Sequence, residues 1–534
     1  MKKLLMVIFT ENFSWGVGIL SSLAQNYGWD VDILFLHSGD VYSRFITFTE
    51  KFSPDLICIS FMSYDRKKAI AIADLSNKMK IKVICGGVHP TFMPLDVALT
   101  NKFDAIIEGD GMGVWKEILN NYHSLSNSML IKGKRNHNRK LYTSLFYSSS
   151  QIERMTKTRS AMLLSSQGCP YKCRFCASSK LQYSAYKPEE IVSMMSQLNE
   201  KYGVNNFQFF DDLFACSAQR CKNIREKVEE HFDSEIKIKY GNFVMARASG
   251  FNELIATELV KMGVECVNFG IETTSPKLLS FLNKKQTKED CYKAMRICKD
   301  YGLIRKVNLM FGVPTQSQDD YEFTLQFVKE TRPEIKSCFF FAPLPGCDLY
   351  NYCFDNAYLP DSYDRNRFDW FGAKTDGFAD IQCRLNKVDY EMGTAYKEKI
   401  EQSEYYYQLN NLVKSIKMID RHSWVIFGSS RTYYFKKFLK HLSSLEYLNC
   451  LGYIDLEEEG EFLIGNNPKL QKYSRSGLNK PRLCITYCYL GGEDFNFMKR
   501  AVDSYFDNIP LISLSSFKGH SVIDIQNIIE NITI

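Results

Sequence analysis

The 534-residue sequence lacks the features that mark membrane and secreted proteins. It has no uninterrupted apolar stretch of about 18 residues, so we expect no membrane-spanning helix. The short apolar run after Met1-Lys2-Lys3 is cut by Glu11 and Asn12, and no small-residue cleavage site follows. We therefore interpret this run as a buried strand and not as a signal peptide.

The sequence also lacks a strong charge bias and a disulfide framework. A net charge of +6 is mild for this length, and no basic patch of the kind that binds nucleic acid stands out, so a nucleic-acid partner is not expected. Of the 17 cysteines, three form one motif and the others have no framework spacing. Reduced thiols of this kind predict a cytoplasmic protein.

The most informative stretch is a cysteine loop. Cys169, Cys173 and Cys176 are spaced C-x3-C-x2-C directly after an apolar run, and Gly168 and Pro170 flank the first cysteine. Three close thiolates can hold three irons of a four-iron, four-sulfur cluster and leave the fourth iron open for a substrate. A zinc knuckle or three buried thiols are the alternatives, but a zinc knuckle needs a fourth ligand close by in the sequence, and none lies between Ser178 and Ala215.

This motif, with the aromatic Phe175 before the third cysteine, resembles the signature of the radical S-adenosylmethionine (SAM) superfamily. The resemblance implies that Cys169, Cys173 and Cys176 bind the cluster metal and that the open iron chelates the amino and carboxylate groups of SAM. An electron then cleaves SAM to a 5′-deoxyadenosyl radical. It also implies an external electron donor of the flavodoxin or ferredoxin type.

Residues 1–122 predict a doubly wound, flavodoxin-like α/β domain. Continuously apolar strands alternate with helical segments, as in a parallel sheet that is covered on both faces. Ligands bind such domains at the carboxyl ends of the strands. The expected strands span residues 4–9, 31–36, 56–60, 83–85 and 105–107.

The loops at these strand ends resemble those of the cobalamin-binding domain that precedes many radical SAM domains. The resemblance implies cobalamin contacts from residues at or near the strand ends: Phe13, Gly16, Ser60, Ser63, Gly86, Gly87, Glu108 and Gly109. Phe13 stands where many cobalamin proteins place a histidine ligand of cobalt, so no imidazole is expected there. His89 is the rival ligand, although a His-Pro turn favours a structural role.

Residues 123–158 are expected to be a connector, and residues 159–355 a second α/β domain. Six strands are predicted at 161–165, 206–210, 237–241, 266–270, 304–311 and 338–342, with a helix over Pro188 to Tyr202 that begins with proline. They match the partial (β/α)6, TIM-like barrel of radical SAM enzymes, in which the chemistry gathers at the carboxyl ends of the strands.

The turns at these ends resemble family motifs that bind SAM. The residues implied are Phe175, Asp211, Asp212, Arg247, Glu272, Gly312 and Pro314. Acidic groups suit the SAM amino group, and the Arg247 guanidinium suits its carboxylate. Glu272 lies in a turn that resembles Gly-Ile-Glu-Ser and is expected to meet the ribose or amino-acid part, and the Gly-x-Pro turn lies near adenine.

Beyond residue 355 the resemblance fades. Residues 356–420 are expected to be a helical, aromatic region that covers the barrel mouth, and residues 421–534 a small Rossmann-like α/β domain. Its glycine fingerprint is incomplete at Gly428, so a bound nucleotide is doubtful and a docking or dimerisation role stays open.

Together these patterns predict a cobalamin-dependent radical SAM enzyme that uses a 4Fe-4S cluster, SAM and cobalamin. Methylation of an unactivated carbon in a small-molecule substrate is the favoured reaction, with ring closure or rearrangement as alternatives. Three other interpretations stay open: a radical SAM enzyme with a non-functional cobalamin domain, an RNA methylthiotransferase-like enzyme and a non-enzymatic Fe–S redox protein.

Overall fold

The computed structural model describes residues 1–10, 14–37, 39–126, 128–134, 145–233, 235–359 and 385–400, and the backbone of four strands beyond residue 400. The chain divides into two compact units, Met1–Lys397 and Glu398–Ile534. Among the described helices, none combines the length and the apolar character that crossing a membrane requires.

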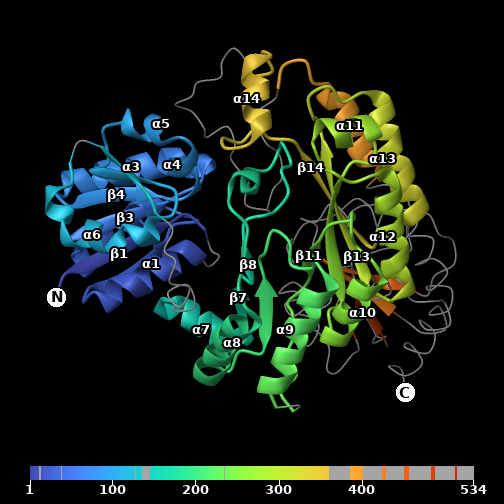
Figure 1. Cartoon of the computed structure of the whole chain (residues 1–534), viewed down its shortest axis with the longest axis horizontal. Coiled ribbons are helices and arrows are strands. Elements are labelled where there is room, and N and C mark those ends of the chain that lie inside the picture. The colour runs from blue at the N-terminus through green and yellow to red at the C-terminus, as the bar shows by residue number, and fades with distance from the viewer. Residues whose placement is uncertain are drawn as a thin grey trace. The chain divides into compact units, whose positions relative to one another are not determined.

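The first domain is a parallel sheet in the order β2-β1-β3-β4-β5-β6 (Figure 1). Its first five strands have the flavodoxin-like order 2-1-3-4-5, which confirms the predicted fold. The strands are β1 Lys3–Ile8, β2 Asp30–Phe35, β3 Leu56–Ser60, β4 Lys82–Gly86, β5 Ala105–Glu108 and β6 Met129–Lys132. All five predicted strands agree with the observed bounds to within one residue at each end, and the bounds of β3 are identical.

Helices cover both faces of this sheet. Helices α1 and α6 pack against each other, and α2 packs against α3 beside a core that includes Phe45 and Ile72. The helices are α1 Trp15–Asn26, α2 Val41–Phe52, α3 Arg66–Lys78, α4 Val88–Phe92, α5 Pro94–Ala98 and α6 Trp115–Asn120. Short 3-10 turns span Ser63–Asp65, Gly111–Gly113 and Tyr122–Ser124.

The segment predicted as a connector contributes to the folded domains. Its strand β6 pairs in parallel with β5, from Ala105 opposite Met129 to Glu108 opposite Lys132. The side chains of Met129 and Leu130 are 46% and 42% exposed, as fits an edge strand with a solvated face. Helix α7, Ser149–Thr158, then begins at Ser148, which closes a capping box with Gln151.

The second domain contains six parallel strands that follow one another in chain order. Strand β7 pairs with β10, and β11, β12, β13 and β14 form a four-stranded sheet. Isolated bridges from Asn206 to Lys239 and from Ala215 to Ala246 connect the two sheets. The strands are β7 Ser160–Leu163, β10 Asn206–Phe209, β11 Val244–Ala246, β12 Cys266–Glu272, β13 Ile304–Phe311 and β14 Ile335–Phe340. A short antiparallel pair, β8 Ser166–Gln167 and β9 Ser184–Ala185, flanks the cysteine loop.

The predicted third strand, residues 237–241, is wrong, because only Lys239 makes a bridge there and the strand is β11. Gly241 has φ +70°, and a Cβ at this position would lie 2.3 Å from Oε1 of Gln208. The backbone therefore turns at Gly241 in a conformation that glycine adopts readily, and regular pairing begins only at Val244.

Helices cover the outer side of this partial barrel. Buried Val307, Leu309 and Phe311 alternate along β13 with partly buried Asn308 and Met310, so one strand face packs against helices and the other faces the barrel interior. Figure 1 shows α10, α12 and α13 beside these strands. The helices are α8 Pro188–Tyr202, α9 Ala218–His231, α10 Glu253–Met262, α11 Pro276–Phe281, α12 Lys288–Asp300, α13 Gln318–Thr331 and α14 Asp348–Asp355, with a 3-10 turn at Ala177–Lys180.

The second unit contains a four-stranded parallel sheet in the order β16-β15-β17-β18. Its strands are β15 Trp424–Gly428, β16 Cys450–Asp455, β17 Leu483–Thr486 and β18 Leu511–Ser513. A parallel sheet fits the small α/β domain expected for residues 421–534. Most of the predicted cover region lies outside the described residues, apart from 356–359 and the helix-containing stretch 385–400.

Candidate functional site

The cysteine loop follows β8 at the edge of the barrel. Cys173 is buried, whereas Cys169 and Cys176 are half-buried. Gly168 enters the loop with φ +69°, and a Cβ at this position would lie 3.0 Å from the carbonyl oxygen of Gln182. In the described part of the chain no three His, Cys, Asp or Glu side chains are gathered around a single metal-ion position.

Backbone contacts from the end of α11 and the start of α14 hold this loop. The Arg174 amide donates to the Leu282 carbonyl at 3.0 Å, and its guanidinium donates to the Phe281 carbonyl at 3.1 Å. The Leu349 amide donates to the Arg174 carbonyl at 2.9 Å, and Asn283 Nδ2 donates to the Lys172 carbonyl at 2.7 Å. The loop conformation is therefore set by long-range contacts that bring in both helices.

The three thiols are a suitable donor set for a cluster once they have lost their protons. Burial raises the pKa of the Cys169 and Cys176 thiols. The negative charge of nearby Asp212 adds to this effect, and backbone N–H groups oppose it. Thiolates are the ligands of iron–sulfur clusters, so cluster assembly at these cysteines releases protons.

Arg247 directly follows β11 and points at the cysteine loop. Its Nη1 lies 3.8 Å from Cys173 Sγ, its Nε donates to Ser249 Oγ at 2.7 Å, and its guanidinium lies 3.9 Å from the centre of the Tyr171 ring. The side chain is buried, and its Nη2 has no hydrogen-bond partner among the described residues. A buried guanidinium nitrogen without a partner next to the thiols fits an anionic ligand, such as the SAM carboxylate.

The two predicted aspartates have different surroundings. The buried carboxylate of Asp211 accepts hydrogen bonds from the Ser165 amide at 3.0 Å, from Ser165 Oγ at 2.8 Å and from Ser166 Oγ at 2.5 Å. It therefore ties the end of β10 to the start of the cysteine loop. Asp212 is exposed, accepts a hydrogen bond from Ser178 Oγ at 3.0 Å, and is the better placed of the two for the SAM amino group.

Glu272 ends β12 at an irregularity, because the pairing with β13 shifts register between Gly270 and Glu272. Its backbone has φ +64°, which is uncommon for a residue with a side chain. The buried carboxylate lies 3.4 Å from Lys284 Nζ. The register shift and the left-handed backbone therefore coincide at the residue that pairs with Lys284.

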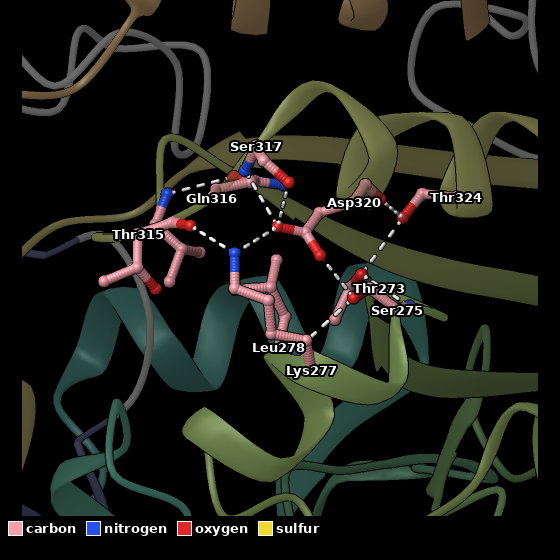
Figure 2. A network of polar contacts seen from close by, with 10 residues as sticks. Thr273, Ser275, Lys277, Leu278, Thr315, Gln316, Ser317, Asp320 and Thr324 are labelled. Carbon is pink, nitrogen blue, oxygen red and sulfur yellow. Dashed lines mark hydrogen bonds and ion pairs between the residues drawn. The ribbon is translucent and has the colours of Figure 1, made fainter.

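A polar network supports the turns that follow β12 and β13. Figure 2 shows Lys277 and Asp320 pointing toward each other between these turns; Lys277 Nζ lies 3.2 Å from Asp320 Oδ2 and donates to the Thr315 carbonyl at 2.9 Å. Asp320 also accepts from Ser275 Oγ at 2.5 Å and from the Ser317 amide at 2.8 Å. Burial raises the pKa of Asp320, but these hydrogen bonds outweigh it and lower the pKa overall.

The predicted adenine turn follows β13 directly. Gly312 has φ +67°, and its amide donates to the Tyr321 hydroxyl at 3.3 Å. A Cβ at Gly312 would lie 3.0 Å from Cδ1 of Phe340, so a larger residue would crowd the turn. Val313 is buried, and Pro314 completes the turn.

The predicted cobalamin residues gather where the first sheet ends. Ser60, Gly86 and Glu108 are the last residues of β3, β4 and β5, and Gly87 and Gly109 follow two of these strands. Gly87 has φ +101°, and a Cβ there would lie 2.8 Å from Ser60 Oγ and 2.9 Å from the Phe61 amide nitrogen. The Gly87 turn therefore brings the loops after β3 and β4 into close contact.

Two further glycines leave open space on this edge. A Cβ at Gly16 or at Gly109 would meet nothing within 4 Å, which leaves room for a bulky ligand to approach the backbone. Phe13, predicted at the position of the usual cobalt ligand, lies outside the described residues.

His89 is fully buried, and both of its ring nitrogens are engaged. Nδ1 lies 2.9 Å from Ser63 Oγ, and Nε2 lies 3.0 Å from Asp96 Oδ2, which also pairs with Arg66 at 2.6 Å. Burial lowers the His89 pKa, and the Asp96 carboxylate opposes this effect only in part. These contacts support the structural role predicted for the His-Pro turn. They also involve Ser63, one of the residues predicted to contact cobalamin.

The strand ends of the first domain contact the radical domain. Tyr64 and Met93, from the loops after β3 and β4, pack against a hydrophobic group that Phe175 of the cysteine loop also contacts. We call this group the shared cluster; its buried members are Leu278, Leu282, Val313, Phe341, Cys347, Leu349, Tyr350, Cys353, Leu359 and Leu385. Trp15 Nε1 also donates to the Tyr186 hydroxyl at 3.3 Å. The edge expected to bind cobalamin and the cysteine loop therefore contact the same core.

Sequence patterns did not indicate several residues that shape this site. Lys284 acts through a buried contact with Glu272, 12 residues away. Asp320, Ser165 and Ser166 act through buried contacts with residues 45 or 46 positions away. The local sequence around each of these residues predicts only an ordinary loop or helix cap. The sequence gives one indication: Asp320 is the third residue of the helix that follows Ser317, and this spacing predicts a capping box. The spacing does not predict the further hydrogen bond of Asp320 with Ser275.

Comparison with known proteins identifies both domains. The model of the B12 binding domain matches residues 1–119, and the model of the radical SAM superfamily matches residues 163–328. An uncharacterized methyltransferase of Pyrococcus horikoshii is 26% identical over 381 residues, which cover 66% of this chain and 81% of that protein. The bacteriochlorophyllide d C-12(1)-methyltransferase of Chlorobaculum tepidum is 23% identical over 365 residues, 66% of this chain and 74% of that protein.

A solved structure shares the fold. The radical S-adenosylmethionine methyltransferase TsrM from Kitasatospora setae, with tryptophan and a SAM analogue bound, superposes with a TM-score of 0.56 and 17% identity, covering 68% of this chain and 79% of that protein. The two matched domains imply a 4Fe-4S cluster, SAM and cobalamin as cofactors. The three thiols of the cysteine loop fit the cluster, and the open space at Gly16 and Gly109 fits cobalamin. The chain therefore belongs to the radical SAM superfamily, as an enzyme whose radical SAM domain is preceded by a B12-binding domain.

Proposed function

We propose that this protein is a cobalamin-dependent radical SAM methyltransferase that methylates an unactivated carbon of a small-molecule substrate. The observation that carries the proposal is the shared cluster, on which the loops after β3 and β4 and the cysteine loop both pack. Cobalamin at the first edge and SAM at the second would therefore approach one substrate from two sides. When bound, the cluster and SAM supply hydrogen abstraction, and cobalamin supplies the methyl group.

In this proposal the cysteine loop binds the cluster, and the carboxyl ends of the barrel strands bind SAM. Cys169, Cys173 and Cys176 hold three irons, and Phe175 anchors their loop on the shared cluster. The loop is held from both sides by contacts with the end of α11 and with α14, so the cysteines that would hold the cluster keep a fixed place.

The side chains around that position provide complementary charges for SAM. The Nη2 of Arg247 would receive the carboxylate, and Asp212 would receive the amino group. Glu272 would accept a ribose hydroxyl, and the Gly312 to Pro314 turn would lie against adenine. Each of these groups is at or beyond the carboxyl end of a barrel strand, where barrel enzymes gather their chemistry.

The first domain would hold cobalamin against its glycine-rich edge. Ser60, Gly86, Gly87, Glu108 and Gly109 form that edge, and Gly16 adds open space at the start of α1. The contacts of His89 with Ser63 and Asp96 keep its imidazole inside the domain. Cobalt would therefore receive no histidine from this turn.

The test uses anaerobically reconstituted protein with cobalamin, methyl-labelled SAM and a one-electron donor such as reduced flavodoxin. We expect 5′-deoxyadenosine and S-adenosylhomocysteine as products, the first from radical cleavage and the second from methyl transfer. Formation of 5′-deoxyadenosine without any S-adenosylhomocysteine, in protein that has taken up cobalamin, would exclude methyl transfer. Candidate substrates can then be screened by uptake of the labelled methyl group.

A further inference from the structure

A buried ion pair connects Lys284 to the carboxylate assigned to SAM. Lys284 Nζ lies 3.4 Å from Glu272 Oε1, and the two side chains are only 8% and 11% exposed. The pair passes over Gly270, where an added Cβ would lie 2.7 Å from Glu272 Oε1 and 3.1 Å from Lys284 Nζ. The missing side chain at Gly270 is therefore what makes room for this ion pair.

The backbone at both ends of the pair is in a rarely populated conformation. Glu272 has φ +64°, and the neighbours of Lys284 in the sequence, Asn283 and Lys285, have φ +50° and +51°. Such conformations persist in folded proteins only where the surroundings impose them. The segments that carry Glu272 and Lys284 therefore both contain left-handed backbone beside the ion pair.

The segment that carries Lys284 is also attached to the cysteine loop. Lys284 Nζ lies 5.4 Å from the ring centre of Phe175, the residue before Cys176. Asn283 donates to the Lys172 carbonyl at 2.7 Å, and the Leu282 carbonyl accepts from the Arg174 amide at 3.0 Å. Gln286 Nε2 donates to the Ile271 carbonyl at 3.1 Å, next to Glu272. The segment therefore bridges the cluster loop and the SAM-binding turn.

We propose that Lys284 is a positioning residue that holds the Glu272 carboxylate in its SAM-binding orientation and fixes that turn relative to the cysteine loop. This inference rests on the proposed role of Glu272 in binding SAM. Lys284 contacts Oε1, so Oε2 is the oxygen that receives the ribose hydroxyl. Without the ammonium group, the buried carboxylate loses its counter-charge and is expected to move toward solvent.

The test is a double-mutant cycle on SAM affinity in anaerobically reconstituted protein, measured by equilibrium dialysis with labelled SAM. Lys284→Met and Glu272→Gln should each weaken binding by roughly tenfold or more, the loss typical of a charge-assisted hydrogen bond. The double variant should be no weaker than the single variants, because Lys284 acts through Glu272. Lys284→Arg should restore most of the affinity, and the exposed neighbour provides the matched control Lys285→Met, which should bind as the wild type does.

Iron content and the midpoint of thermal unfolding are measured on every variant. Additive losses in the double variant would mean that Lys284 contacts SAM itself, and wild-type affinity of Lys284→Met beside a weak Glu272→Gln would mean that the ion pair has no positioning role. Either result overturns the inference and leaves the proposed function intact. A wild-type protein that holds its cluster and binds no SAM would instead overturn the proposed function. Should Lys284→Met lose iron, Lys284→Gln replaces it in the same cycle.

Discussion

Arg247 and Cys173 are joined by a contact of 3.8 Å between Nη1 and Sγ, and a second nitrogen of the same guanidinium is buried without a partner. One arginine therefore lies beside a thiol proposed to bind the cluster and has a second nitrogen that is open to an anion. Its stacking on Tyr171, itself part of the cysteine loop, fixes the plane of the guanidinium between them.

We expect Arg247→Gln to weaken SAM binding because the paired charge is lost while the side chain keeps a hydrogen-bond donor. The loss should be roughly ten- to hundredfold in the dissociation constant. Binding of labelled SAM to the reconstituted protein measures it, with iron content as the control. Unchanged affinity would show that the free nitrogen does not face the SAM carboxylate.

Replacement of Cys169, Cys173 or Cys176 by Ala should abolish the visible absorbance of the reconstituted cluster and the formation of 5′-deoxyadenosine. A four-iron cluster with three protein ligands cannot spare one of them. The exposed Cys216 supplies the control, and Cys216→Ala should keep about four irons per chain. A colourless Cys216→Ala protein alongside a brown Cys173→Ala protein would contradict the assignment.

The sequence predicted best where local signals are strong. Strand β13, Ile304–Phe311, and helix α8, Pro188–Tyr202, have the predicted bounds because apolar periodicity and an initial proline define them locally. The cysteine motif likewise lies within one loop. All three features can be recognised without knowledge of distant contacts.

Other features depend on contacts between residues that are far apart in the sequence. The partnership of Lys284 with Glu272 requires the register shift at the end of β12, which no local pattern reveals. Asp211 and Asp212 are adjacent and chemically identical, yet buried serines engage the first and leave the second exposed. Strand β11 is only three residues long, too short for its period to be recognised.

Gly87→Ala should destabilise the first domain. The added Cβ would lie 2.8 Å from Ser60 Oγ and 2.9 Å from the Phe61 nitrogen, at a φ of +101° that side chains disfavour. A cost of about 1–3 kcal/mol is typical of such strain. Thermal unfolding measures the change, and Gly16→Ala is the control, since it has no atom within 4 Å and should be at least as stable as the wild type.

Bound cob(II)alamin should show no nitrogen hyperfine splitting from His89 in its electron paramagnetic resonance spectrum. The His89 imidazole is buried, with one nitrogen at Ser63 and the other at Asp96, so it does not reach a ligand outside the domain. His89→Ala should leave the spectrum unchanged and lower only the stability of the fold. Splitting that disappears in His89→Ala would identify His89 as the cobalt ligand.

Asp65 should make the stability of the first domain depend on pH. Burial raises the pKa of its carboxyl to about 6, and the attraction of Lys68 offsets this only in part. Because the folded pKa lies above the unfolded value, ionised Asp65 destabilises the fold fully above pH 6, and the penalty disappears as the pH falls toward the unfolded pKa near 3.8. Asp65→Asn should therefore raise the free energy of unfolding at pH 7.5, by about 1–3 kcal/mol.

The same comparison at lower pH supplies the decisive control for Asp65. The gain from Asp65→Asn should shrink between pH 6 and pH 4 and be lost below that range, because the wild-type carboxyl is then protonated in both the folded and the unfolded state. Asp55→Asn provides a comparison at an exposed carboxylate, which accepts a hydrogen bond from the Lys3 amide at 2.7 Å. Urea unfolding at a series of pH values measures both variants. A gain for Asp65→Asn that stays constant from pH 7.5 to pH 4 would mean that its effect arises from packing and not from the buried charge.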